Sequence, residues 1–141
     1  MQMTTYLSFR GQCEEAFKFY EATLGGRLGP IFRYIGTPMA GQVPADWQDK
    51  VMHGSVKVGE LVLMGADVGP EHHEQFKGFS LSLQLKDIAE AERIFHELET
   101  DGQVTLPLAQ TFWAARFGMV VDRFGVPWLI NCEGSNQPQE V

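Results

Sequence analysis

The chain is poor in cysteine, in long apolar runs and in basic residues, and each shortage narrows its class. Its 141 residues include two cysteines, Cys13 and Cys132, and neither belongs to a Cys-x-x-Cys pair of the zinc or redox type. No apolar run reaches the roughly 18 residues of a membrane helix. The first residues also lack the basic and apolar regions of a signal peptide. We therefore expect a cytoplasmic protein with reduced thiols and no membrane contact.

The charge balance argues against a nucleic-acid partner. The chain carries 11 basic and 18 acidic residues, for a net charge of −7. An acidic surface repels the phosphate backbone, so we expect no nucleic acid to bind. The composition, 44% hydrophobic and 21% charged, is ordinary for a globular protein. At this length, residues 1–141 predict a single domain that buries roughly 70% of the unfolded chain's surface.

The segment 111–131 is the most informative part of the chain. Two apolar runs flank the polar sequence Asp122-Arg123-Phe124-Gly125, which predicts a β-hairpin with glycine at the positive-φ position of its turn. Asp122 is expected to cap this turn. The whole segment contains five aromatic residues, which are Phe112, Trp113, Phe117, Phe124 and Trp128. That much aromatic surface must be buried against a core or around a small molecule.

The first half reads as a strand, a helix and three further strands. We expect strands at 5–9, 28–35, 51–58 and 60–64, with a hairpin turn at Gly59 and a long loop over 36–50. A helix is expected over 12–24, ended by Gly25-Gly26. Its apolar stripe is expected to comprise Cys13, Ala16, Phe19, Tyr20 and Leu24.

The second half repeats this order. A strand over 79–85 is followed by a helix that Asp87 opens, with Glu90 at capping-box spacing. A short strand over 103–106 and the aromatic hairpin follow. The apolar stripe of the helix consists of Ile88, Ala91, Ile94, Phe95 and Leu98, and Cys13 falls on Ile88 when the helices are superposed. The repeat predicts two βαβββ modules, about 1–67 and about 78–133, followed by a mobile tail over 134–141.

Several of these segments resemble the vicinal oxygen chelate superfamily, which includes glyoxalase I, bleomycin-resistance proteins and extradiol dioxygenases. The strand Tyr6–Phe9 and the helix segment Glu14–Gly26, with Phe19-Tyr20 followed by Leu24-Gly25, resemble the first superfamily module. The PhnB-like branch is indicated by Met52-His53, Thr111–Ala114, Phe117-Gly118 and the hairpin segment 122–128. The resemblance implies an α+β fold, in which two βαβββ modules form a cupped mixed β-sheet around a cavity. Superfamily members often pair, and open sheet edges favour pairing, so we expect a homodimer.

The resemblance also implies a divalent metal held by four side chains, and here the chain departs from the superfamily pattern. The four ligand positions fall near Thr5, Met64, Phe79 and Leu129. None of these is a competent ligand for a metal such as zinc, nickel, iron or manganese. A shift of one or two residues brings in Asn131 but not a set of four. We therefore expect no metal and no other cofactor, the alternative being a divalent metal in a rearranged set.

PhnB-like proteins are often named as relatives of demethylubiquinone methyltransferase, and the residues do not support that activity. A typical methyltransferase holds S-adenosylmethionine on a glycine-rich turn after the first strand of a parallel α/β sheet. No Gly-x-Gly-x-x-Gly occurs in this chain, and the order of strands and helices is wrong for that fold.

His53 is the candidate catalytic residue. It lies in an expected strand at a position that recurs in the PhnB-like pattern, where it acts either as a polar group at a pocket or as a hydrogen-bonded structural residue. The pair His72-His73 lies in a polar loop and is expected to be solvated. His96 is expected to be exposed on its helix. Arg116 is expected to face solvent, the alternative being an anchor for an anionic ligand.

Three functions remain open. The first is binding of a small apolar or aromatic molecule in the cup without a metal, with His53 as polar anchor and an apolar lining of Met64, Phe112, Trp113, Phe117 and Trp128. For the aromatic members of this set, plain core packing is an equal alternative. The second is a metal-dependent lyase, isomerase or dioxygenase that holds its metal through His53. The third is a non-catalytic dimeric domain.

Overall fold

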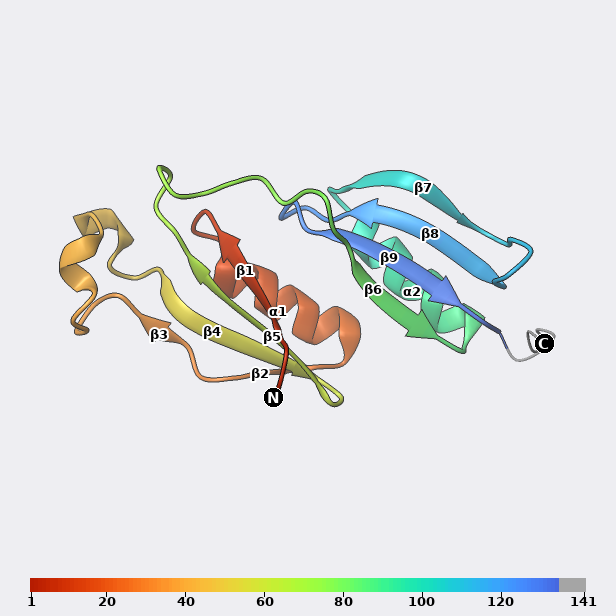
Figure 1. Cartoon of the computed structure of the whole chain (residues 1–141), viewed down its shortest axis with the longest axis horizontal. Coiled ribbons are helices and arrows are strands. Elements are labelled where there is room, and N and C mark those ends of the chain that lie inside the picture. The colour runs from red at the N-terminus through yellow and green to blue at the C-terminus, as the bar shows by residue number, and fades with distance from the viewer. Residues whose placement is uncertain (135–141) are drawn as a thin grey trace. The chain divides into compact units, whose positions relative to one another are not determined.

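The structure is a computed structural model that describes residues 1–134, and the chain divides into two units, Met1–Glu74 and Gln75–Val141 (Figure 1). Each unit has its own sheet and helix and is described by itself. The tail expected over 134–141 lies, apart from Gly134, outside the described residues. Within residues 1–134, neither helix has the length and apolar character needed to cross a bilayer.

Unit 1 consists of one helix against one mixed sheet. Its strands are β1 (Thr5–Phe9), β2 (Arg27–Leu28), β3 (Phe32–Arg33), β4 (Val51–Val58) and β5 (Leu61–Asp67), and its helix is α1 (Cys13–Leu24). The sheet order is β1-β5-β4-β2, with β3 also paired to β4. Strand β1 runs parallel to β5, and the other pairs are antiparallel. Two 3₁₀ turns, Ala40–Gln42 and Ala45–Trp47, lie in the connection between β3 and β4.

Unit 2 has the same order of elements. Strand β6 (Leu81–Leu85) is followed by α2 (Ile88–Glu99), β7 (Gln103–Ala109), β8 (Arg116–Val121) and β9 (Pro127–Cys132). The sheet order is β6-β9-β8-β7, with β6 parallel to β9. In both units the first strand therefore lies beside the last, and the chain winds as βαβββ twice. The predicted α+β class and the predicted repeat are confirmed.

The helices form where the sequence pattern places them. Helix α1 ends at Gly25, which adopts the left-handed conformation with φ +70° and donates its N–H to Glu21 O. Helix α2 begins after Asp87, whose carboxylate accepts the N–H of Glu90 at 3.0 Å. The buried residues of α2 are Ala91, Ile94, Phe95 and Leu98, which are four of the five residues of the predicted stripe, and Ile88 is half-buried.

Two expectations for unit 1 are wrong in detail. The strand expected over 28–35 is broken into β2 and β3, because Pro30 has no N–H to donate to a sheet ladder. On α1 the buried phenylalanine is Phe17, not Phe19. Each helical residue turns by about 100°, so Phe17 lies only about 40° from Cys13 around the axis, whereas Phe19 lies about 120° away.

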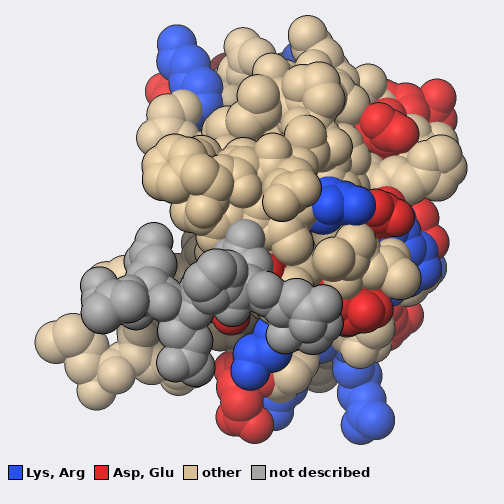
Figure 2. Space-filling view, turned by 90° about the vertical axis from the view of Figure 1, so that its right-hand side faces the viewer, with Lys and Arg blue, Asp and Glu red and all other residues tan. Residues whose placement is uncertain are grey.

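The hairpin at the end of unit 2 forms as predicted, but it begins later than expected. Gly125 has φ +85°, and Asp122 Oδ1 accepts the N–H groups of Phe124 and Val126, so the expected cap is present. Phe112 and Trp113 precede the strand and lie in the β7–β8 connection. This connection stands at the right-hand end of Figure 1 and faces the viewer in Figure 2, where uncharged residues cover much of the upper surface.

Candidate functional site

The face of the unit 1 sheet that α1 does not cover carries His53 and Met64. A Cβ added to Gly54 or Gly65 would meet the Phe17 ring of α1, at 3.9 Å and 2.9 Å respectively. These two glycines therefore point toward the helix. Side chains alternate along a strand, so their neighbours His53 on β4 and Met64 on β5 project from the opposite face. We call this surface the open face of unit 1.

His53 contacts two aromatic side chains on this face. The Tyr6 Oη and His53 Nδ1 atoms are 3.3 Å apart, and the two rings stack with centroids 5.8 Å apart. Phe32 stands in register with His53 on the neighbouring strand β3, with ring centroids 6.4 Å apart. The exposed fractions of Tyr6 and Phe32 are 51% and 52%. The imidazole is thus in contact with two rings that each keep half of their surface in water.

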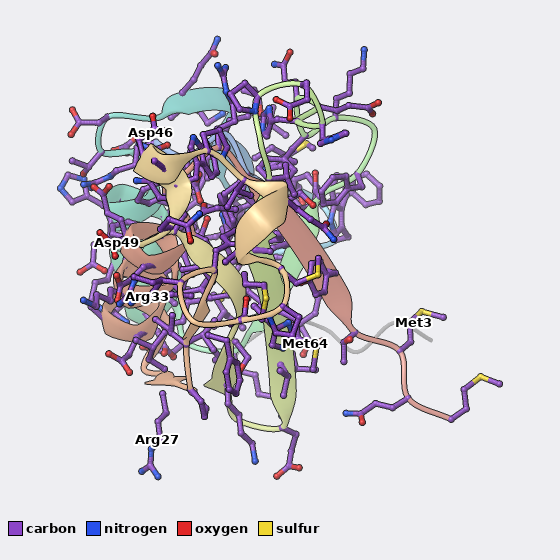
Figure 3. The ribbon with its side chains drawn as sticks, turned by 90° about the vertical axis from the view of Figure 1, so that its left-hand side faces the viewer. Met3, Arg27, Arg33, Asp46, Asp49 and Met64 are labelled. Atoms are coloured by element: carbon purple, nitrogen blue, oxygen red, sulfur yellow. The ribbon has the colours of Figure 1, made fainter. Side chains whose placement is uncertain are left out.

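Met64 extends the same surface. It pairs with Tyr6 across β1 and β5 and with Ser55 across β5 and β4, so the three side chains form one row across the open face. Figure 3 shows Met64 on its strand in side view. The hydroxyl of Thr4 lies 3.9 Å from the Met64 sulfur. Around His53 and Met64 the face is apolar apart from hydroxyl groups and the imidazole, a composition that suits a neutral organic ligand. Lys57, two residues beyond Ser55 on β4, lies farther along the same face and is charged.

The protonation of the Tyr6–His53 pair follows from this environment. Burial raises the pKa of Tyr6 above its ordinary value of about 10, with smaller contributions from the acidic groups of Cys13 and Tyr34. Tyr6 is therefore a neutral phenol at pH 7. It donates to His53 Nδ1 in one imidazole tautomer and accepts from it in the other, so the ring nitrogen left for another molecule is Nε2.

The sheet of unit 2 carries a second aromatic cluster. A Cβ on Gly118 would meet Phe95 of α2 at 2.9 Å, so Phe117 projects from the face opposite the helix. The Trp113 ring lies 5.1 Å from that of Phe117, and the Phe112 ring lies 4.8 Å from that of Trp113. The exposed fraction is 94% for Phe112 and 40% for Trp113. Trp113 packs against Phe117 although Trp113 lies outside the strand.

Trp128 occupies a different environment from the other aromatic candidates. Its side chain is 1% exposed, and its indole Nε1 donates to Asp122 Oδ2 at 2.9 Å. It alternates with Leu129 on β9 and shares the buried face with Ile130 and Cys132. The core alternative for Trp128 therefore agrees with the structure, and we leave this residue out of the proposed site.

The comparisons with known proteins decide the family. A protein-family model described as 3-demethylubiquinone-9 3-methyltransferase matches residues 1–131. The chain belongs to this PhnB-like family.

Relatives of the PhnB-like chain agree with this assignment. Protein YjdN of Escherichia coli K12 is 33% identical over 139 residues, covering 93% of this chain and 95% of YjdN. The crystal structure of protein PA1353 from Pseudomonas aeruginosa is 46% identical, with a TM-score of 0.86, and the match covers 96% of this chain and 99% of that one. A Bacillus cereus structure titled as a putative 3-demethylubiquinone-9 3-methyltransferase, PhnB protein, is 27% identical, with a TM-score of 0.82 over 94% and 99% of the two chains.

The wider superfamily is visible in the fold alone. A glyoxylase/bleomycin resistance protein/dioxygenase domain from Frankia sp. EAN1pec is 11% identical and has a TM-score of 0.66 over 94% of this chain and 97% of that one. The PhnB-like chain therefore has the vicinal oxygen chelate fold that its motifs resemble. Each of its two sheets is mixed and wound as βαβββ, which differs from the parallel α/β sheet of a typical methyltransferase.

The residues of the PhnB-like chain do not fit the superfamily's divalent metal. Within residues 1–134, no three His, Cys, Asp or Glu side chains gather in a group that could hold an ion. Two of the ligand positions are expected near Met64 and Leu129, and neither side chain offers a nitrogen or oxygen donor. The side chain of His53 adjoins Tyr6 and Phe32 rather than a carboxylate. We therefore derive no chemistry through a metal.

The remaining polar candidates of the PhnB-like chain are placed away from these clusters. His96 is exposed on α2 as expected and lies 3.2 Å from Glu99. His72 is exposed beside Glu71, and burial, aided by nearby Arg10, lowers the pKa of His73. Arg116 is only partly exposed and pairs with Glu92 of α2 at 3.1 Å, so neither the solvent-facing nor the ligand-anchoring expectation describes it fully.

Sequence reasoning missed Tyr6 and Phe32. The strand 5–9 was expected, and its alternation places Tyr6 opposite the buried Leu7, so the face of Tyr6 was available from the pattern. Its partner was not available, because His53 lies 47 residues further along the chain. Phe32 was missed because one continuous strand was expected over 28–35. In the structure the strand breaks at Pro30, and the short strand that follows pairs Phe32 with His53.

Proposed function

We propose that this protein binds a small apolar or aromatic molecule on the open face of unit 1, without the superfamily's metal. The observation that supports it best is the contact of His53 with two aromatic side chains, Tyr6 and Phe32, that are each half exposed. Half-exposed large rings around a polar group are typical of ligand sites, because the rings supply contact area and the polar group supplies orientation.

The rings can supply a useful part of the binding free energy. Aromatic side chains bury about 150–250 Å² each, and about 25 cal/mol is gained for each Å² removed from water. Covering the exposed halves of Tyr6 and Phe32 would then contribute about 5 kcal/mol before the costs of association. This favours modest affinity for a flat molecule that spans both rings.

His53 and Tyr6 form the polar anchor of the proposed site. Because Nδ1 is occupied by the Tyr6 hydroxyl, Nε2 is the atom that would meet a ligand. Among residues 1–134, no side chain or backbone group hydrogen-bonds to Nε2. A ligand hydroxyl can donate to this nitrogen or accept from it, according to the tautomer. An aromatic alcohol therefore suits this face, because its ring can lie against Tyr6 and Phe32 while its hydroxyl meets Nε2.

The experiment uses 1-naphthol and ¹⁵N-labelled protein. We expect shift changes centred on β1, β4 and β5, and a dissociation constant that rises about tenfold in Tyr6→Ser and in Phe32→Ser. The matched control is Phe79→Ser, which removes a partly exposed ring from unit 2 and should leave the constant unchanged. Equal affinity in the wild type and in the Tyr6→Ser/Phe32→Ser double variant would disprove the proposal. If 1-naphthol causes no shift changes in the wild type, the result would favour the third function, a non-catalytic domain.

The expected homodimer, the cytoplasmic location and the absence of a nucleic-acid partner stay predictions. Support for the dimer comes from the exposed apolar side chains Leu106 on β7 and Phe112 beyond it. Sedimentation equilibrium at micromolar concentration tests it directly. A mass of one chain across that range would rule out a stable dimer, and a lower association constant in Phe112→Ser would place the contact at the β7–β8 connection.

A further inference from the structure

The side-chain amide of Asn131 in unit 2 has a hydrogen-bond acceptor without a donor. Its Oδ1 atom is inaccessible to water, and it is the one such buried side-chain atom without a partner among residues 1–134. Buried polar atoms in native proteins are nearly always paired, so each exception calls for an explanation such as an absent ligand or a bound water. This atom lies in unit 2, and the inference it carries goes beyond the site proposed in unit 1.

A chain of hydrogen bonds sets the orientation of this amide. Asn131 Nδ2 donates to Gln84 Oε1 at 2.7 Å, and Gln84 Nε2 donates to Ser82 Oγ at 2.8 Å. The nitrogen side of the Asn131 amide is therefore occupied by Gln84, and the oxygen is the end that is left over. Gln84 stands in register with Asn131 across β6 and β9, so the contact follows from strand pairing.

The side chains near Asn131 on its face of the sheet are uncharged and include an aromatic ring. Phe117 stands directly opposite Asn131 across β8 and β9, on the same face of the sheet, and Trp113 packs against Phe117 with ring centroids 5.1 Å apart. The side chains that share this face on β6, β8 and β9 are Ser82, Gln84, Phe117, Met119, Val121, Pro127, Leu129 and Asn131. None of them is charged, so the face suits a neutral molecule.

We propose that the unit 2 face binds a neutral, flat molecule that places an N–H group on Asn131 Oδ1 while its ring lies against Phe117. The ligand must displace the atoms that now shield the oxygen from water. Because that oxygen has already lost its water, a donor that reaches it gains a hydrogen bond at little further cost in desolvation. A molecule of the same shape without the N–H leaves the acceptor unpaired and binds more weakly.

The probes are indole, which has an N–H, and 1-methylindole, which has the same ring system without it. Both are titrated into ¹⁵N-labelled protein, and the shift changes should centre on β8 and β9. We expect indole to bind about three- to tenfold more tightly than 1-methylindole, the ratio that one net hydrogen bond supplies. The ratio should fall to about one in Asn131→Leu, with the affinity for 1-methylindole unchanged.

The matched control is Ser82→Ala, which removes a hydroxyl from the far end of the same hydrogen-bond chain and should preserve the indole preference. Asn131→Leu should also fold with unchanged or higher stability, because it removes the unpaired acceptor. Equal affinity for the two probes in the wild type would overturn the proposal. A preference that survives Asn131→Leu, or shift changes confined to unit 1, would also overturn it and leave a bound water as the partner of the amide oxygen.

Discussion

Asp67, the last residue of β5, caps the start of helix α1. Its carboxylate Oδ1 accepts the backbone N–H of Cys13, the first residue of α1, at 2.9 Å, although 54 residues separate the two. The same oxygen accepts the N–H of Gly11, and Oδ2 accepts the N–H of Val51 at the start of β4. The local cap position, Gln12, contributes no side-chain bond. One buried carboxylate therefore joins the start of α1 to the start of β4 and the end of β5. These are the strands that carry His53 and Met64.

Replacing Asp67 by Asn should destabilise unit 1 strongly. The amide keeps one acceptor oxygen but turns an NH₂ group toward an N–H donor, so at least one buried backbone group loses its partner. We expect the free energy of unfolding to fall by about 2–4 kcal/mol. Urea denaturation followed by circular dichroism measures this. The matched control is Asp46→Asn, at an exposed carboxylate, and a loss equal to that of Asp67→Asn would contradict the capping role.

Trp128→Phe should destabilise unit 2, although an aromatic ring is retained. The indole N–H pairs with the buried Asp122 carboxylate, and phenylalanine leaves Oδ2 without that donor. The expected loss in the free energy of unfolding is about 1–3 kcal/mol. The matched control is Trp47→Phe, which makes the same substitution in a loop of unit 1. An unchanged denaturation midpoint in Trp128→Phe would show that the hydrogen bond contributes nothing net.

The Glu14–Arg33 pair predicts a small dependence of stability on pH. The hydrogen bond from Arg33, at 2.9 Å, lowers the pKa of Glu14. A lowered pKa in the folded state stabilises the protein above the ordinary carboxyl value of about 4.3, and the contribution is lost as pH falls through the folded-state pKa. Both side chains are partly exposed, so the effect should be about 0.2–1 kcal/mol.

The Glu14 titration can be followed by carbon NMR. Arg33→Met should raise the pKa of Glu14 toward its ordinary value, whereas Arg27→Met, at an exposed arginine, should leave it unchanged. Figure 3 shows Arg33 beside Asp49, whose backbone oxygen also accepts from Arg33, and shows Arg27 pointing away from them. An unaltered Glu14 titration in Arg33→Met would refute the assignment.

Metal analysis separates the proposed binding function from a metal-dependent enzyme. The donor set within residues 1–134 predicts that zinc, nickel or manganese added to the purified protein is removed by gel filtration. Elemental analysis checks this. About one metal ion per chain, retained by the wild type and lost in His53→Ala, would establish the competing function in which His53 is a ligand.

Both thiols should be unreactive in the native protein. Cys13 and Cys132 are buried and free, and burial beside Asp67 raises the pKa of Cys13 far above its ordinary value. The Cys13 thiolate is therefore scarce at pH 8, and burial shields Cys132 from reagents. A chromogenic disulfide reagent should detect almost no thiol in the native protein and two thiols per chain after denaturation. Fast reaction of one thiol in the native state would contradict the buried placement.

Local sequence patterns were enough to predict many of the secondary-structure elements of this protein. The two helices, the hairpin turns at Gly59 and Gly125, and the caps at Asp87 and Asp122 all depend on residues within a few positions of one another. Apolar periodicity and turn chemistry act over that range, so the βαβββ repeat and its family resemblance follow from the order of the residues alone.

The candidate sites required the tertiary structure. The contacts of His53 with Tyr6, of Asp67 with Cys13 and of Asn131 with Gln84 each join strands or helix ends that are 47 or more residues apart. Sequence determined the elements of this protein because helices and turns form from neighbours. Only strand pairing decided which face each side chain joins, because a register shift of one residue would send every side chain of a strand to the opposite face.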